Sequence, residues 1–292
     1  MKSIKWSLAL ALLSAPTLLM AQSPIGGFMQ GKGKGNVVVS YSRETYDQVY
    51  LVPAKVNGVP VFNKVTTESV STYATIGLSS KVDFIANIPY VSRRGEASQQ
   101  VLTNLGYTNL KEGLQDVSFY IKYNPYNFKI GKGTLALVGA LGIDAPLSDY
   151  KVNEGLQSII AIGNHATKIN SIILAQYKSN CGIFVNGQVG YSIRNNDVPN
   201  AFSSEVKIGY AAKHFYVDAY SSTIVSTSGT DILKEGFQGF FPGTKVVSTK
   251  IGGSVYVPLL KGLGVAGGAS SYVQGRNLGV ASGYYAAIIY SF

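Results

Sequence analysis

The chain has 292 residues, of which 46% are hydrophobic and only 14% are charged, against roughly 25% charged residues in an ordinary soluble domain. Its 33 glycines and 20 tyrosines exclude a disordered chain, which would be poor in aromatic residues, and a coiled coil, which would be rich in Glu, Lys and Leu. The formal net charge is +10, but lysines and arginines never form a run of five or more, so we expect no nucleic-acid partner.

The N-terminus has the pattern of a cleaved secretory signal peptide, which we place at residues 1–21. Two lysines form a basic start, residues 6–13 form an apolar core, and Ala21 offers a small residue at the cleavage position. A membrane anchor is the alternative, but Pro16 interrupts the apolar run and no stop-transfer charges follow it. The sequence therefore predicts an exported protein.

Residues 22–35 precede the first predicted strand and end in the sequence GKGKG at 31–35. Because glycine leaves the backbone free to adopt many conformations, we expect a flexible lead on the periplasmic side. A role as a plug of the lumen stays open for this segment.

From residue 36 onward, apolar residues alternate with polar ones at a period of two, which is the period of a β-strand. For example, Phe84, Ala86 and Ile88 fall on one face, while Asp83 and Asn87 fall on the other. A tilted strand needs about 9–11 residues to cross a bilayer, and every predicted strand is long enough. The predicted strands cover residues 36–52, 68–79, 82–93, 114–125, 132–144, 167–179, 182–194, 201–211, 214–225, 246–258, 263–275 and 278–292.

Short and long connections alternate between these segments. The gaps after strands 2, 4, 6, 8 and 10 are short, and those after strands 1, 3, 5 and 9 are long; the gaps after strands 7 and 11 are short exceptions. Outer-membrane barrels have short periplasmic turns and longer extracellular loops, and a sheet in lipid must close to pair its backbone groups. We therefore predict an all-β fold for residues 36–292: a transmembrane antiparallel up-and-down β-barrel of about 12 strands.

The chain ends in an aromatic residue behind an alternating strand, with Tyr290 and Phe292 on the apolar face. This ending resembles the assembly signal of bacterial outer-membrane proteins, although Phe292 could also simply cap a hydrophobic strand. The resemblance implies the outer membrane of a Gram-negative bacterium, with membrane lipid and the barrel-assembly machinery as partners.

Two stretches resemble the outer-membrane family named after the meta-pathway of phenol degradation. Residues 112–123, EGLQDVSFYIKY, resemble its hairpin of the form G-L-x-D followed by K-Y. Residues 135–150 resemble its next strand, but the expected glycine is absent and Asp149 directly follows Ser148. The resemblance implies a barrel that transports small solutes, aromatic or hydrophobic molecules among them.

If the apolar faces meet lipid, the opposite faces line the lumen. A Lys or Arg facing lipid at the membrane midplane would cost about 2–4 kcal/mol, so the consistent placement of charges on the other face supports this register. Barrels of about eight strands are filled and those of about sixteen contain a channel, so an open and a filled lumen both remain possible. The residues expected to line a solute path are Asp83, Asp116, Tyr120, Lys122, Lys178, Arg194, Glu205, Lys207, Tyr216, Asp218, Tyr220 and Lys250.

The tyrosines divide into two predicted groups. Those facing the lumen could stack on an aromatic solute. Those near strand ends are expected to form interfacial girdles against the membrane surface. The girdle group consists of Tyr90, Tyr123, Tyr191, Tyr210, Tyr256 and Tyr290.

Catalytic and metal-binding patterns find little support in the sequence. His165 falls in a predicted long loop and His214 at a predicted turn, and neither has a recognisable catalytic neighbourhood. Two distant histidines and the single Cys181 do not have zinc-ligand spacing. We predict a solute channel without cofactor or metal. The alternatives are a non-conducting barrel that acts through its extracellular loops and, third, an enzyme acting on envelope lipid.

Overall fold

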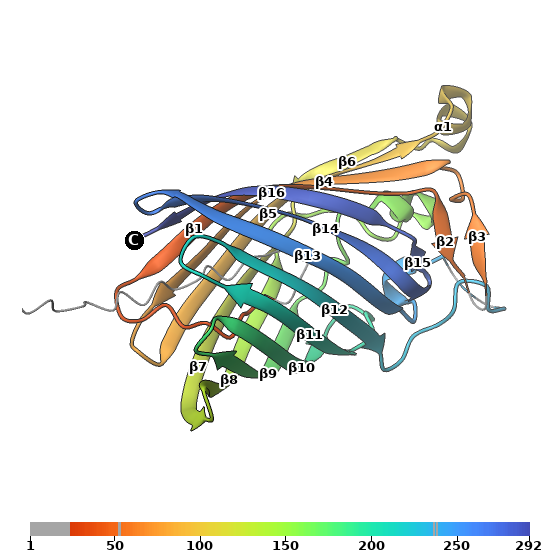
Figure 1. Cartoon of the computed structure of the whole chain (residues 1–292). Helices are drawn as coiled ribbons and strands as arrows, with labels where there is room; N and C mark the ends of the chain where they lie inside the picture. Colours follow the sequence, from red (N-terminus) through yellow and green to blue (C-terminus); the bar gives the residue numbers. More distant parts are fainter. Residues whose placement is uncertain (1–23, 52–53, 236, 238) are drawn as a thin grey trace, which may run out of the picture.

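The computed structural model describes residues 24–51, 54–235, 237 and 239–292, and the predicted signal peptide lies outside this range. Within the described residues, twelve antiparallel strands close into a barrel (Figure 1). Each of these strands pairs with its neighbours along the chain, which is the up-and-down topology that the alternation predicted. The barrel strands are β1 (Gly35–Tyr46), β4 (Lys64–Gly77), β5 (Val82–Glu96), β7 (Asp116–Ile130), β8 (Gly133–Pro146), β9 (Lys168–Ser179), β10 (Ile183–Arg194), β11 (Ala201–Ala211), β12 (Tyr216–Ser226), β13 (Val247–Leu260), β14 (Leu263–Arg276) and β16 (Ser282–Ser291).

The barrel closes where its first and last strands meet. β1 pairs with β16 from Asn36 opposite Ser291 to Thr45 opposite Ser282, and with β4 on its other side. Closure gives backbone N–H and C=O groups partners across the strands, which a sheet in lipid requires. Among the described residues, no helix is long and apolar enough to cross a membrane.

The outward faces are apolar along the barrel. Ile173, Val206 and Ile288 expose 67%, 61% and 60% of their surface, while the alternate residues on the same strands are buried. This pattern fits contact with lipid and confirms the predicted transmembrane barrel. Tyr256 corrects the girdle prediction, because it packs against the buried cluster inside the barrel instead of lying in an outer belt.

Some strand ends differ from the prediction. β7 continues to Ile130 through an irregularity between Tyr123 and Tyr126, so the turn into β8 shrinks from the predicted 126–131 to Gly131 and Lys132. Pro125 lies in this irregularity, and proline cannot donate to the ladder; here it interrupts the pairing without ending the strand.

The first and last predicted strands are each interrupted near the long loops. β1 ends at Tyr46, and β2 (Gln48–Tyr50) joins β3 (Lys55–Asn57) and β15 (Leu278–Gly279) in a small separate sheet. β16 begins only at Ser282, so β15 and β16 replace the single strand predicted over 278–292.

The long-loop end of the barrel carries a folded cap (Figure 1). It contains α1 (Gln99–Leu105), β6 (Leu110–Leu114), which extends the sheet beside β5, and the short helices η1 (Gly155–Ile160) and η2 (Phe241–Gly243). The Ser98 side chain accepts from Val101 N at the start of α1, and Gly106 ends the helix at a φ of +66°, a conformation that glycine adopts without strain. The loops join the rim through a buried apolar cluster of Val59, Phe62, Val65, Leu102 and Ile160.

Candidate functional site: a lumen in two levels

The chain segment before β1 lies inside the barrel at its short-turn end. Ile25 and Gln30 are 3% and 4% exposed, and Ile25 packs with Val38, Ile85 and Leu174 from the barrel wall. Residues 24–31 of the predicted lead therefore reach into the lumen, which corrects the expectation of a periplasmic segment for this part, whereas Lys32, Gly33 and Lys34 are exposed beside the end of β4. We call residues 24–31 the inner segment.

A buried ion pair holds the inner segment. Lys122 on β7 lies directly opposite Asp83 on β5, with 2.9 Å between Lys122 Nζ and Asp83 Oδ2, and both side chains are 0% exposed. Lys122 Nζ also donates to the carbonyl oxygens of Gly26 and Phe28 at 3.3 and 2.6 Å, and Gln30 N donates to Asp83 Oδ2 at 3.1 Å. Buried charges need such partners, and here the backbone of the inner segment supplies them.

Aromatic contacts support the same segment from the opposite wall. The Phe28 ring meets Phe184 edge-on at 5.3 Å, and Lys178 Nζ lies 5.3 Å from the Phe28 ring centre. Phe184 stacks on Tyr216 at 5.3 Å, and the Tyr216 hydroxyl donates to Asp218 at 2.7 Å. The inner level of the lumen is therefore packed with side chains.

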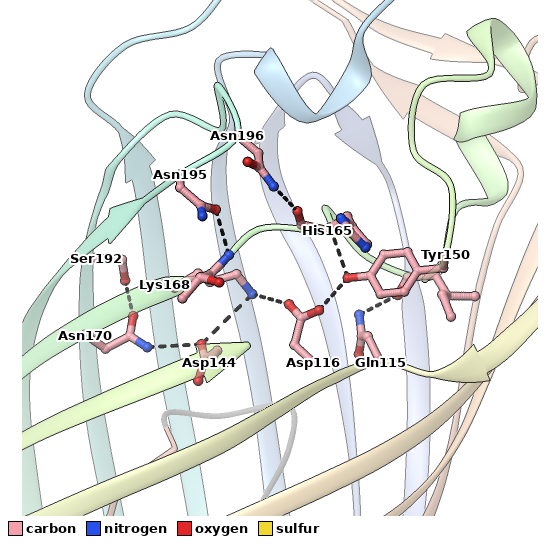
Figure 2. A network of polar contacts seen from close by, with 12 residues as sticks. Gln115, Asp116, Asp144, Tyr150, His165, Lys168, Asn170, Ser192, Asn195 and Asn196 are labelled. Atoms are coloured by element: carbon pink, nitrogen blue, oxygen red, sulfur yellow. Dashed lines mark hydrogen bonds and ion pairs between the residues drawn. The ribbon is translucent and has the colours of Figure 1, made fainter. Parts of the chain in front are cut away.

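The outer level is organised around Lys168, the first residue of β9, as Figure 2 shows. Its Nζ donates to Asp116 Oδ2 at 2.9 Å and lies 4.0 Å from Asp144 Oδ2. Asp144 also accepts from the Tyr120 hydroxyl at 3.2 Å and from Asn170 Nδ2 at 3.0 Å. Charged groups of both signs therefore lie next to each other on the inner face of β7, β8 and β9.

The loop between β8 and β9 is fastened to this network. The Tyr150 hydroxyl donates to Asp116 and accepts from His165 N at 3.0 Å (Figure 2). Burial, followed by the hydrogen bond to Asp116, raises the pKa of Tyr150 above its ordinary value. Arg93 Nη1 donates to the Ala161 carbonyl at 2.8 Å, which fixes a second point of the loop. These contacts hold the loop against the lumen wall, of which it forms a part.

Three adjoining cavities occupy the outer level of the described structure. The largest, about 760 Å³, lies under the folded cap, and we call it the vestibule. It is lined by apolar groups such as Leu156, Ile159 and Phe241 and by Arg93 and Asp116. Its volume falls within the roughly 300–1,000 Å³ of small-molecule sites.

Two smaller cavities lie next to the vestibule. The β10 chamber, about 340 Å³, is lined by residues of β9 to β12, including Arg194 and Glu205, and by Pro24 of the inner segment. The β1 chamber, about 330 Å³, is lined by serines and Glu44 on the β1 side. Lys168 lines the vestibule and both chambers.

The predicted lumen residues all face inward but divide between the two levels. Asp116, Tyr120, Arg194, Glu205 and Lys250 line the cavities of the outer level. The others belong to the packed interior, where Lys207 Nζ lies 3.7 Å from Glu205 and 3.8 Å from Asp218. That these residues line a solute path stays a prediction. The residues of the packed interior are Asp83, Lys122, Lys178, Lys207, Tyr216, Asp218 and Tyr220.

Sequence reasoning missed several members of the outer network. Lys168 and Asp144 lie on predicted strands in the same inward register as the chosen residues, so the alternation could have identified them. Arg93 lies in the same inward register as Asp83, so the alternation could have identified it too, although not its contact with the Ala161 carbonyl. Tyr150 belongs to the loop between β8 and β9, where a period of two carries no signal.

The two histidines lie in connections between strands, and the His165 ring packs edge-on against Tyr150 at 5.0 Å. His165 Nε2 is 3.7 Å from Asp149 Oδ1 in the loop after β8, and His214 lies in the turn between β11 and β12. Within the part of the chain that the structure describes, no group of three or more His, Cys, Asp or Glu residues is placed to hold a metal ion. The lumen offers a solute hydrogen bonds and charges of both signs.

Comparison with known proteins identifies similar folds. The crystal structure of an outer membrane channel from Pseudomonas putida F1 is 12% identical and superimposes with a TM-score of 0.70, covering 89% of this chain and 96% of that chain. The NanC porin is 8% identical with a TM-score of 0.48, covering 87% of this chain and 98% of that one. No family model and no curated protein matches the sequence. The first likeness supports the fold, which is that of an outer-membrane β-barrel.

Proposed function

We propose that this protein is an outer-membrane channel for small solutes, aromatic or hydrophobic molecules among them. The observation that carries the proposal is the row of cavities that begins under the loops and adjoins two chambers at Lys168. A filled structural barrel would not need such a set of adjoining cavities. The shared fold with the channel from Pseudomonas putida F1 supports the same class.

The lining suggests how a solute would pass. The vestibule presents apolar side chains from the cap, which suit an aromatic or aliphatic body. Deeper in, the charged network of Lys168, Asp116 and Asp144 offers fixed polar contacts. The inner segment closes the far end, so passage requires residues 24–31 to shift. No enzymatic step is part of this proposal.

Planar-bilayer recording tests the channel directly. The mature protein, shown to be folded by its heat-dependent gel shift, is inserted into a bilayer with asymmetric salt. We expect discrete current steps with a measurable reversal potential. A bilayer that stays silent both for this protein and for a variant lacking residues 24–33 would overturn the channel.

A surface-interaction role is the second candidate, and the packed cap favours it. The loops form a buried cluster around Phe62 and Leu102, while Val101 and Leu105 of α1 are 38% and 48% exposed. If the barrel has this role, replacing residues 97–109 by a short glycine linker should abolish the binding of a surface partner to whole cells and leave solute flux unchanged. Lost flux with unchanged binding would contradict it.

We also propose that the last strand addresses the chain to the assembly machinery, after signal-peptide cleavage behind Ala21. Tyr290 and Phe292 are 54% and 51% exposed on the outer face, and their rings stack at 6.3 Å. Deleting Phe292 should lower the amount of folded barrel in the outer membrane, measured by the gel shift. Replacing the exposed Phe128 by alanine provides a control, and an equal loss in both variants would contradict an address function.

A further inference from the structure

Arg194 differs from the other cations around the β10 chamber. Lys168 and Lys250 line the same chamber, and each has a carboxylate partner, Asp116 for Lys168 and Glu44 for Lys250. Among the described residues, no carboxylate oxygen lies within 4.0 Å of the Arg194 guanidinium, and its Nε is buried without a hydrogen-bond partner. A buried donor left unpaired in this way costs free energy.

The strand register places a second cation opposite it. Arg194 pairs with Lys168 across β10 and β9, and both side chains line the β10 chamber. Like charges directly opposite each other on neighbouring strands are destabilising. Asp144 attracts Arg194 electrostatically, but its oxygens already accept hydrogen bonds from Tyr120 and Asn170.

The carboxylates that line the chamber are engaged elsewhere. Asp144 accepts hydrogen bonds from Tyr120 and Asn170, and Glu205 Oε1 lies 3.7 Å from Lys207 Nζ. Of the three cations in the lining, the Arg194 guanidinium is therefore the one without a carboxylate at ion-pair distance. Its planar fork suits the two oxygens of a carboxylate, which can accept two parallel hydrogen bonds.

We propose that the β10 chamber binds the carboxylate of a small organic acid at Arg194, and that this contact makes the lumen selective for monocarboxylates. The chamber of about 340 Å³ has room for a small ring or short chain beside the carboxylate. Ile172 and Tyr272 offer it apolar surface within the same lining. The inference rests on the proposed channel, since the acid must enter through the vestibule.

Calorimetry with two probes of the same shape tests the site. Benzoate and the neutral benzamide are titrated into the full mature protein in detergent, for the wild type, Arg194→Gln and Arg194→Lys. The control is Arg43→Gln, which makes the same change at a half-exposed arginine paired with Glu68 at 3.4 Å. Every variant is first shown to be folded by its gel shift.

We expect the wild type to bind benzoate on the order of tenfold more tightly than benzamide. Arg194→Gln should remove that preference, Arg194→Lys should keep part of it, and Arg43→Gln should leave it intact. Equal binding of the two probes by the wild type would overturn the carboxylate site. So would an equal loss for both probes in Arg194→Gln, because that would indicate a general change of packing.

Flux into vesicles separates this proposal from the channel proposal. If benzamide crosses and the benzoate preference depends on Arg194, both proposals stand. If neither probe crosses while the preference persists in calorimetry, the channel fails and the carboxylate site stands. If both probes cross equally and Arg194→Gln changes neither binding nor flux, the channel stands and the carboxylate site fails.

Discussion

The two levels of the lumen come from the same strands and the same alternation, yet one is filled and the other hollow. At the inner level, Lys122 and Asp83 are 0% exposed and hold the inner segment. At the outer level, the Lys168 side chain stays 22% exposed beside three cavities. The alternation determines which side chains point inward. Whether the space between them is open depends on a segment outside the barrel strands.

The same kind of ion pair therefore has a different role at each of the two levels. In the packed level, charges are removed from water, so their partners decide whether the structure is stable. In the hollow level, charges border solvent, so they act on whatever enters. This contrast predicts effects on conductance and stability at the inner level and on selectivity at the outer level.

The largest expected effect comes from removing the inner segment. Deleting residues 24–33 should raise the single-channel conductance severalfold, because their backbone and Ile25 fill the inner level. The measurement is the current step at fixed voltage. An unchanged step from a barrel with a normal gel shift would show that the inner segment does not limit the current.

Breaking the buried pair should destabilise the barrel. Lys122→Met leaves Asp83 buried without its cation, a change expected to cost about 3–5 kcal/mol. Urea unfolding in detergent, followed by the gel shift, measures the change in the free energy of unfolding. Lys129→Met on the exposed part of the same strand is the control, and equal effects of both changes would contradict the contrast.

Changing the outer network should alter selectivity more than stability. Asp116→Asn keeps an acceptor for Tyr150 but removes the charge that faces Lys168. The reversal potential in asymmetric potassium chloride should shift toward anions. Asp149→Asn, at a fully exposed loop carboxylate, should shift it much less because solvent and salt screen that charge.

The smallest expected effect concerns the loop between β12 and β13. Asp231 accepts from Arg276 Nε at 2.7 Å and from Asn277 Nδ2 at 2.9 Å, and these contacts lower its pKa to about 2. A carboxyl whose pKa is lowered in the folded protein stabilises the fold fully at any pH above its unfolded pKa of about 3.9. The contacts of Asp231 should therefore hold the loop equally well from neutral pH down to about pH 5. They should weaken as the pH falls toward 2.

A nitroxide label reports the motion of this loop. With Ser228→Cys labelled in a Cys181→Ser background, mobility should rise only at acidic pH. Asp231→Asn should make the label mobile at every pH. A variant as immobile as the parent at neutral pH would show that Asp231 does not fasten the loop.

The sequence was sufficient to predict the barrel because lipid leaves a clear periodic pattern. Outward apolar residues such as Val206 and Ile288 mark each strand, and closure follows from backbone pairing. The plugged inner level could not be predicted, because Lys122 binds carbonyl oxygens of Gly26 and Phe28, and every residue carries a carbonyl. Tyr256 was misplaced for a related reason: position near a strand end does not distinguish inward from outward faces.

The boundary between the two chambers has a consequence for the size of solute that the barrel can hold. Lys168 and Asp144 line both the β10 chamber and the β1 chamber, with 4.0 Å between Nζ and the carboxylate oxygen. At this point the partition is made of side chains rather than backbone. Side-chain rotations are far faster than loop or domain movements. Turning these side chains aside would widen the contact between the two spaces, so the usable width of the barrel depends on side-chain rotamers, with Lys168 and Asp144 among them.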